Sequence, residues 1–551
     1  MSRGNGRLGA EFRTIAEALD AAAGGDAGLG FFSSRGELAS SMSYAALREA
    51  ALTAGRALLS SGLARGDRVA VIAETGPDFL SAFHGCQYAG LVPCPLPFMT
   101  FIGGRDAYCA RIGSLMRAAD ARAICAPAAL EGVAREAAEG IGALALSFDQ
   151  LRIGGANMPM TPSGPDDLAY IQFSSGSTAA PKGVPVRQAA LRANVAAILN
   201  DGVQLTQEDR AFSWLPFYHD MGLVSLSLAA LFGQCPVDYI APSSFARRPG
   251  LWIELMSRLG STITAAPTFG YRLAAQRAAP ADAIDLSRLR IAGVGGDMIR
   301  LDDLEAFAAA LSAKGFDAAA FRPSYGLAEA TLAVAFADRL ETHDPSSDAA
   351  QPGESARRFV VCGRVISGHE LIIAAPDGAP MPGGEVGRIL VRGPSIMDGY
   401  VRPSTDGSPL GPDGFLDTGD LGYLVEGKLV VTGRARDVLH FRGRNIWPED
   451  IEWTAERIPP LKAGDTAAFG VSDGAGDDRL VVLVQSGMPD DAAETLCQRV
   501  RVAVSEAAGV VCEVVTVPPR SLPFTSSGKL SRQAARLKYL GGEFGRVPSA
   551  D

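Results

Sequence analysis

The first hundred positions alternate between a helical spacing of apolar residues and short continuous apolar runs. Four apolar residues recur at the spacing of one helix face, at Leu47, Ala51, Ala54 and Leu58. Ser43 precedes them as an N-cap, and the run Val69–Ile72 that follows predicts a buried strand. A second helix is expected from Pro77 to about Ala89, then a short strand at Leu91–Val92 before a proline-rich turn. Repetition of this unit predicts an α/β fold with largely parallel sheets.

The pattern restarts after Gly433. Strands are expected near 466–469, 480–485 and 510–517, with a helix near 492–507. We therefore predict a large N-terminal domain over residues 1–433 and a small, mobile α+β domain over residues 434–551. The polar, proline-containing segment Ala337–Arg358 interrupts the large domain and is expected to be a surface insertion.

Composition narrows the class of protein without identifying it. The chain has 551 residues, of which 47% are hydrophobic and 20% charged, and its formal net charge is -10. That charge disfavours binding to nucleic acid or to an anionic membrane, since both need a basic face. No apolar run has the length of a signal peptide or of a membrane span. The eight cysteines form no Cys-x-x-Cys pair and are expected to be buried thiols in a reducing cytoplasm.

The strongest local signal is a loop rich in hydroxyl residues and glycine. Residues 170–183 read Tyr-Ile-Gln-Phe-Ser-Ser-Gly-Ser-Thr-Ala-Ala-Pro-Lys-Gly, in which a strand ends at Phe173. Such a loop can direct backbone N–H groups and hydroxyls at phosphate oxygens, and Lys182 adds a cation. It is not a Walker loop, because Pro181 rather than glycine precedes the lysine. Composition alone would favour a flexible Ser/Gly loop without a ligand.

Six further segments follow it in order. They are Trp214–Gly222, Leu289–Arg300, Arg322–Thr331, Phe415–Leu421, Gly433–Asp437 and Thr525–Arg532. Each alone has an ordinary explanation: His219-Asp220 could be a structural hydrogen-bonded pair, and Lys529 a solvated surface lysine. Only five histidines occur in the chain, which makes a histidine metal site improbable.

Together the loop and these segments resemble the signatures of the acyl-CoA synthetase, luciferase and peptide-synthetase adenylation superfamily, over nearly the whole chain. The resemblance implies an enzyme that uses ATP and Mg²⁺ to convert a carboxylic acid into an acyl-AMP. Three positions depart from the usual pattern. Ala179 replaces a glycine, Asp297-Met298 replaces Glu-Pro, and Arg436 stands at the hinge where Asp or Lys is common.

The resemblance also implies residue roles. The phosphates are expected at Ser174, Ser175, Gly176, Ser177, Thr178 and Lys182. The adenosine is expected at Gly296, Asp297, Met298, Ser324, Tyr325, Gly326, Asp420 and Arg434. Glu329 and Thr178 would hold Mg²⁺, since both supply hard oxygen ligands. His219 would border the acyl carboxylate, and Lys529 would bridge that carboxylate and the α-phosphate of ATP.

Within the superfamily, fatty acyl-AMP ligases match best. Four features favour them: Leu96–Tyr108, Tyr218–Gly222, the insertion Ala337–Arg358, and Arg442–Glu452, where CoA synthetases commonly have a Ser-Gly-aromatic pattern. The substrate would be a fatty acid and the acceptor an acyl carrier protein in trans. A fatty acyl-CoA synthetase is the alternative, because the insertion is short. A non-catalytic nucleotide sensor is a second one, disfavoured because Lys529, Glu329 and Asp420 are all present. An amino-acid adenylation domain would need an amine-binding aspartate, which is absent from Ala230–Gln234.

Overall fold

The computed structural model describes residues 9, 11–98, 104–155, 158–174, 181–277, 284–344, 358–403, 407–441, 444–472, 478–524 and 529–544. They form two compact units. Residues 1–343, 359–418 and 423–431 belong to the first, and residues 344–358, 419–422 and 432–551 to the second. The boundary expected after Gly433 falls close to the point where the chain leaves the first unit. Each unit is described here by itself.

The first helices begin and end where their sequence predicts. The Ser43 hydroxyl accepts a hydrogen bond from the Ala46 amide at 3.1 Å and caps α2 (Tyr44–Ser60). The four residues with helical spacing are all buried, as expected for a helix that packs one face on the core. Helix α3 (Pro77–Ala89) has proline in its first turn and ends at Gly90, whose φ of 67° is readily adopted by glycine. Both helix predictions are confirmed.

A small parallel sheet forms one part of the first unit. Its order is β4 (Val92–Leu96), β3 (Arg68–Ile72), β5 (Ala123–Ala126) and β6 (Leu144–Ser147). The proline-rich turn expected after Val92 is wrong, because Pro93 and Pro95 lie within β4. Strand β4 lies at the edge of the sheet and, among the described strands, pairs only with β3. The backbone nitrogens of every second residue therefore point away from the partner strand and need not donate a hydrogen bond. Proline, which has no N–H, is tolerated at these positions.

A 14-stranded sheet is the largest sheet of the first unit, and two of its strands include residues assigned to the second unit. Its strands run parallel from one side through β1 (Gly28–Phe32), β10 (Val237–Ile240), β9 (Ala211–Ser213), β11 (Ile263–Ala266), β12 (Ile291–Val294) and β13 (Phe321–Gly326). Beyond β13 the order is β14 (Ala333–Phe336), β16 (Phe359–Val365), β20 (Lys428–Arg434), β19 (Leu416–Val425), β18 (Gly387–Arg392) and β17 (Glu370–Ala374), and β2 (Leu38–Ser43) closes the other edge. Where β13 meets β14 the pairing becomes antiparallel. The predicted α/β class is confirmed.

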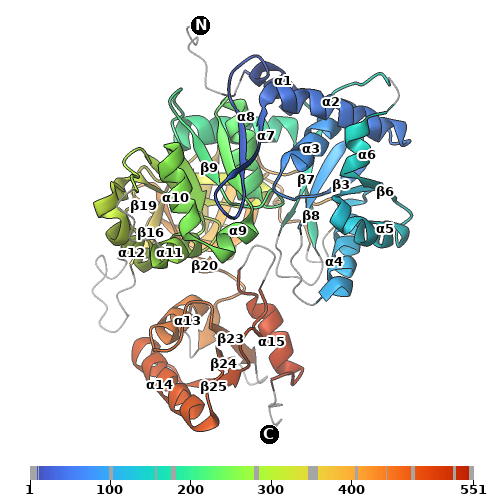
Figure 1. The fold of residues 1–551 in the computed structure, drawn as a ribbon. Helices are drawn as coiled ribbons and strands as arrows, with labels where there is room; N and C mark the ends of the chain where they lie inside the picture. Colours follow the sequence, from blue (N-terminus) through green and yellow to red (C-terminus); the bar gives the residue numbers. More distant parts are fainter. Residues whose placement is uncertain are drawn as a thin grey trace. The chain divides into compact units, whose positions relative to one another are not determined.

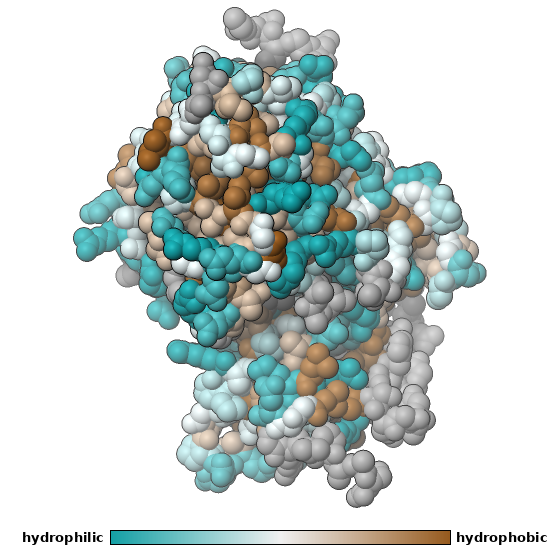
Figure 2. Space-filling view, turned by 90° about the vertical axis from the view of Figure 1, so that its right-hand side faces the viewer, coloured by the Kyte–Doolittle hydropathy of each residue, from teal (hydrophilic) through white to brown (hydrophobic). Residues whose placement is uncertain are grey.

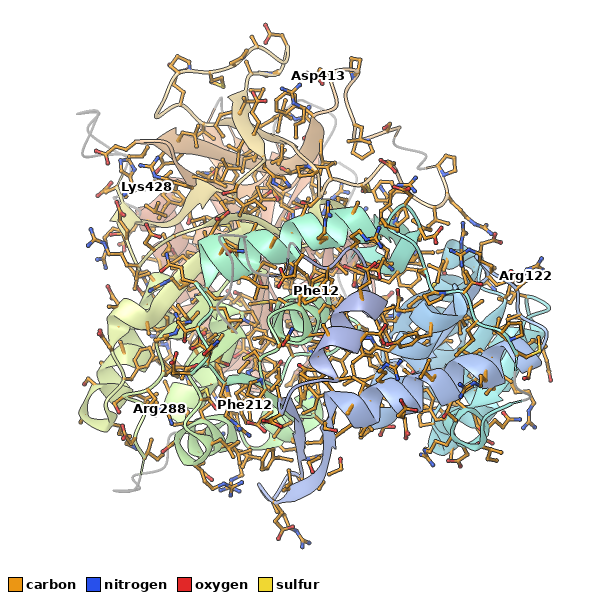
Figure 3. The ribbon with its side chains drawn as sticks, turned by 90° about the horizontal axis from the view of Figure 1, so that it is seen from above. Phe12, Arg122, Phe212, Arg288, Asp413 and Lys428 are labelled. Carbon is orange, nitrogen blue, oxygen red and sulfur yellow. The ribbon has the colours of Figure 1, made fainter. Side chains whose placement is uncertain are left out.

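Helices cover these sheets (Figure 1). They are α1 (Ile15–Ala22), α4 (Gly104–Ala119), α5 (Glu131–Glu139), α6 (Phe148–Ile153), α7 (Gln188–Ala197), α8 (Ala229–Phe232), α9 (Pro242–Arg247), α10 (Gly250–Leu259), α11 (Thr268–Gln276) and α12 (Leu301–Leu311). The core between them is dominated by aliphatic and aromatic side chains. Figure 3 shows Phe212 of β9 in the interior, whereas Arg122 and Asp413 lie at the periphery.

Part of the expected insertion Ala337–Arg358 is a strand. Thr342–His343 forms β15, which pairs antiparallel with β16. On either side of it, Lys428 contacts Glu341 at 2.8 Å, and His343 Nδ1 lies 2.9 Å from the Tyr423 hydroxyl. The base of the segment is thereby attached to the sheet, and residues 345–357 lie outside the described residues.

The second unit is a three-layer α+β structure. Its sheet consists of β23 (Thr466–Ser472), β24 (Asp478–Gln485) and β25 (Cys512–Val517), with β23 and β24 antiparallel and β24 and β25 parallel. Alternate residues of these strands face two separate hydrophobic clusters. One cluster packs under α13 (Pro448–Glu456) and α14 (Asp490–Ala508), and the other under α15 (Arg532–Leu540). Figure 1 shows α13 and α14 on one side of this sheet and α15 on the other. A short hairpin, β21 (Leu439–Phe441) and β22 (Arg444–Ile446), precedes α13. The predicted strands and helix are confirmed.

The surface agrees with the composition. On the face drawn in Figure 2, hydrophilic residues are interspersed with smaller hydrophobic patches, which is ordinary for a globular protein. All eight cysteines are buried, reduced thiols. Among the described residues, no helix has both the length and the apolar composition to cross a bilayer.

A buried ion cluster joins three elements of the second unit. The Arg532 guanidinium at the start of α15 contacts Glu452 at 2.7 Å, Glu449 at 2.8 Å and Asp437 at 3.2 Å. Glu452 also accepts a hydrogen bond from the Ala468 amide of β23 at 3.0 Å. Burial raises the pKa of Glu452 to about 7, although Arg532 acts in the opposite direction.

Arg532→Met should destabilise the second unit by about 3–5 kcal/mol, because it leaves carboxylates buried without a cation. The deficit should be larger at pH 8.5 than at pH 6. Arg532 lowers the pKa of Glu452, so ionising this buried carboxylate costs more in the variant, and the stability difference grows as pH rises through the wild-type pKa of about 7. Urea unfolding of the full chain, followed by tryptophan fluorescence, measures both effects. Lys538→Met is the matched control, since Lys538 lies on the same helix and forms only an exposed pair with Glu543. Equal stability losses in the two variants would contradict the role of the cluster.

Candidate adenylation site

A β-hairpin holds the two ends of the candidate phosphate loop together. β7 (Leu168–Ser174) and β8 (Lys182–Arg187) pair antiparallel, with Ser174 opposite Lys182. The Ser174 Oγ atom is buried and accepts or donates no hydrogen bond among the described residues. A buried hydroxyl without a partner is costly unless a ligand or water completes it. Ser175, Gly176, Ser177 and Thr178, which were predicted to contact phosphate, lie outside the described residues.

One tyrosine links the loop lysine to the candidate metal ligand. The Lys182 Nζ atom lies 5.1 Å from the centre of the Tyr400 ring, and the Tyr400 hydroxyl donates to Glu329 Oε1 at 2.9 Å. Glu329 lies in a 3₁₀ turn, η6 (Ala328–Ala330), directly after β13. Lys182 and Glu329, which are far apart in sequence, therefore both contact the side chain of Tyr400. Sequence reasoning missed Tyr400, because the dipeptide Gly399-Tyr400 has no distinctive composition.

The candidate adenine residues follow two adjacent parallel strands. Gly296, Asp297 and Met298 come after β12, and Ser324, Tyr325 and Gly326 end β13. Because the carboxyl ends of parallel strands meet at one edge of a sheet, the structure brings these two groups together. The Ser324 hydroxyl donates to the Val294 carbonyl at 3.1 Å.

Glycine is required where these strands end. A Cβ atom at Gly295 would lie 2.6 Å from Ser324 Oγ, and Gly296 has a φ of 80°, a conformation that favours glycine. Tyr325 is mostly buried, with 9% of its surface exposed. Gly295 thus lets Ser324 of the neighbouring strand pack against its backbone at the sheet edge.

The candidate carboxylate-binding histidine is attached to the phosphate hairpin. The Gln172 side chain in β7 donates to the Tyr218 carbonyl at 2.7 Å, one residue before His219. His219 Nδ1 lies 2.7 Å from Asp220 Oδ1, and 24% of the imidazole side chain is exposed. The Met221 amide donates to Asp220 Oδ1 at 2.7 Å and to His219 Nδ1 at 3.3 Å, which holds the imidazole and the carboxylate together. A Cβ on Gly296 would lie 3.6 Å from the Met221 sulfur, which places the histidine segment beside the candidate adenine site.

The second unit carries the candidate ribose residues and the lysine. Asp420 has a side chain only 10% exposed, and the Arg434 Nε atom lies 3.3 Å from its Oδ1. The Ala435 amide donates to the Gly419 carbonyl, which holds the two segments side by side. Lys529 is partly exposed and directly precedes the first turns of α15, two residues before its N-cap Ser531. The structure thus pairs Asp420 with Arg434 in one unit, and in the other it brings Lys182 and Glu329 into contact with the same tyrosine, Tyr400.

Arg436, expected at a hinge, has a local partner. Its Nε atom lies 3.6 Å from Asp437 Oδ1, and Asp437 also contacts Arg532 of the buried cluster. Gly433, directly before the candidate ribose residue Arg434, has a φ of 152°, and a Cβ there would lie 2.7 Å from the Trp447 ring. The indole packs so closely against this glycine that a larger residue would displace it.

The small number of carboxylates at the candidate site suits a magnesium ion that takes most of its ligands from phosphate. Among the residues that the structure describes, no three His, Cys, Asp or Glu side chains gather as a metal site. Mg²⁺ in nucleotide sites takes one or two protein ligands and completes its shell with phosphate oxygens and water. Glu329, a single carboxylate beside the phosphate hairpin, meets that requirement. The unpartnered Ser174 hydroxyl and Lys182 suit an anionic polyphosphate.

The fold and this arrangement of residues define an adenylate-forming enzyme. Residues 31–401 match the model of the AMP-binding enzyme family, and the chain belongs to that family.

Similar proteins extend over both units. The chain is 43% identical to a Caulobacter vibrioides protein whose name assigns it provisionally to the acyl-CoA synthetases, over 97% of each chain. It is 31% identical to a long-chain-fatty-acid–AMP ligase of Mycolicibacterium smegmatis, over 87% of this chain and 85% of the relative. A solved structure from a study of fatty acyl-adenylate ligases of E. coli and L. pneumophila is 37% identical, with a TM-score of 0.92 over 97% of this chain and 99% of that one.

Proposed function

We propose that the protein is a fatty acyl-AMP ligase that activates a fatty acid with ATP and Mg²⁺ and then passes the acyl group to a carrier protein. The observation that carries the proposal is the placement of Lys182 and Glu329 on either side of Tyr400, at the end of the hairpin that contains the unpartnered Ser174 hydroxyl. A cation, a carboxylate and a hydroxyl donor in one place are what a metal-bound polyphosphate requires. The eight buried thiols favour a cytoplasmic location.

The reaction joins two anions. A carboxylate oxygen of the fatty acid forms a bond to the α-phosphorus of ATP, the bond from that phosphorus to the bridging oxygen breaks, and pyrophosphate leaves with the electron pair. No proton is transferred when the acid is already ionised. Lys182 and Ser174 would hold the phosphates, and His219 would border the acyl carboxylate. Lys529 would place its charge between the carboxylate and the α-phosphate. Mg²⁺, held by Glu329 and Thr178, would neutralise phosphate charge.

The environment of His219 favours an apolar acyl chain. The π-helix η3 (Met221–Leu228) and α8 follow the histidine, and neither contains a charged residue. Nearly all of these side chains pack in the core of the first unit, with Phe232 edge-on to Phe12 at 6.1 Å between ring centres. A second apolar segment, Ala265–Phe269, ends near Trp214, whose ring centre lies 5.8 Å from that of Phe269. Neither η3 nor α8 offers a carboxylate to an ammonium group, and Asp220, which precedes η3, already contacts His219.

The nature of the acceptor separates two candidate functions. The Arg442–Glu452 segment differs from the pattern common in CoA synthetases, and Ala337–Arg358 could restrict the motion that admits a thiol, as the resemblance implies for the ligases. A carrier protein can add surface contacts to its binding energy, which coenzyme A cannot. Transfer to coenzyme A is the second candidate, favoured by the relative with 43% identity and its provisional synthetase name.

Medium- and long-chain fatty acids should drive ATP–pyrophosphate exchange better than aryl or amino acids, since the region after His219 offers apolar packing and no counter-charge. The measurement is exchange of labelled pyrophosphate across a panel of acids at matched concentrations. Exchange supported best by an amino acid would overturn the proposed substrate class, and no exchange with any acid would overturn the proposed activity.

Lys529→Ala should lower the adenylation rate by about 10²–10³-fold, as removal of a single donor to a developing oxyanion does. The fold should be retained, because a partly exposed side chain leaves no core cavity, and such changes usually cost less than about 0.5 kcal/mol. Lys538→Ala removes an exposed lysine from the adjoining helix and should keep normal exchange. An active Lys529→Ala protein would show that another group bridges the two anions.

Acyl-AMP should accumulate or pass to a phosphopantetheine-bearing carrier protein, with coenzyme A a poor acceptor. Mass spectrometry of products from fatty acid, ATP and either excess coenzyme A or holo-carrier protein tests this. Acyl-CoA formed as fast as acyl-AMP would favour the second candidate function, whereas slow acyl-CoA and rapid acyl-carrier formation would favour the first.

A further inference from the structure

A five-residue segment contacts both the phosphate hairpin and the turn of the candidate metal ligand. The segment is Met397–Val401. The Met397 amide donates to the Glu329 carbonyl at 2.9 Å, and the Val401 amide donates to the Gly183 carbonyl, also at 2.9 Å. Asp398 forms an ion pair with Arg187 at the far end of β8. Backbone bonds at both ends therefore fix this segment between β8 and η6.

Tyr400 lies between these two backbone anchors and contacts the functional side chains themselves. Its hydroxyl donates to Glu329 Oε1, and its ring lies under the Lys182 ammonium. A donor on one carboxylate oxygen restricts the rotation of the carboxylate, as partners of metal-binding carboxylates commonly do. A cation over an aromatic face is attracted to it, which limits where the lysine can move.

We propose that Tyr400 is a positioning residue that sets Glu329 and Lys182 at a fixed separation, so that magnesium and the polyphosphate of ATP bind as one unit. This inference rests on the proposed adenylation function and deepens it. The two halves of the side chain have separate roles. The hydroxyl orients the carboxylate toward the metal, and the ring holds the lysine toward the phosphates.

Substitutions can separate these two roles. Tyr400→Phe keeps the ring and removes the hydroxyl, whereas Tyr400→Leu removes both. Tyr423→Phe is a matched control in the same unit, because it deletes a hydroxyl that has a partner at the same distance, His343 Nδ1 at 2.9 Å. Calorimetric binding of ATP, without any fatty acid, is measured in Mg²⁺ and in EDTA. Thermal unfolding of each full-length variant is measured alongside.

Tyr400→Phe should bind ATP in EDTA nearly as the wild type does, while the concentration of Mg²⁺ needed for half-maximal enhancement rises about tenfold or more. Tyr400→Leu should also lose affinity in EDTA, because Lys182 is no longer held. Tyr423→Phe should change neither quantity. A merely structural tyrosine would lower the unfolding temperature and leave the dependence on Mg²⁺ unaltered.

The outcomes distinguish this inference from the function on which it rests. If Tyr400→Phe shows the same Mg²⁺ dependence as the wild type, the inference is overturned, and acyl-AMP formation by the wild type is untouched. If Mg²⁺ dependence shifts as expected but no fatty acid yields acyl-AMP, the positioning role stands and the proposed substrate class is overturned.

Discussion

Electrostatic repulsion between a carboxylate and a polyphosphate is the constraint that the rest of this structure serves. Both reactants are anions, so a catalyst must supply positive charge and hydrogen-bond donors before any bond forms. In the proposed site the candidate donors are Ser174, which ends β7, and Lys182, which begins β8. The candidate metal ligand Glu329 follows β13, and the candidate ribose acceptor Asp420 lies within β19, where a rigid sheet fixes the backbone.

Buried charges away from the candidate site are also paired. In the second unit, one guanidinium is surrounded by three carboxylates, two of them on α13. The cluster joins Asp437 to the start of α15, whose first residue is Arg532. A buried arrangement of this kind contributes little net stability compared with apolar packing, yet breaking it is costly.

Local physical signals predicted most of the fold. Ser43 as a cap, Pro77 in a first turn and the alternation of apolar residues in 466–485 each act through neighbours in sequence, so the sequence carries them directly. The prediction failed at Pro93 and Pro95, where proline indicates a turn but an edge position makes it compatible with a strand. Whether a strand is at an edge depends on its partners far along the chain, and no local pattern records that.

The candidate site likewise contains residues that the sequence predicted and one that it did not. Lys182, Glu329, Asp420 and Lys529 were predictable because each lies in a segment of unusual composition and spacing. Tyr400 was not, since its importance comes only from two contacts with residues distant in sequence, one through its ring and one through its hydroxyl. A tyrosine in a loop is commonplace; a tyrosine that touches a loop lysine and a turn carboxylate at once is not. Residues that act through others are therefore visible in tertiary structure before they can be found in a sequence pattern.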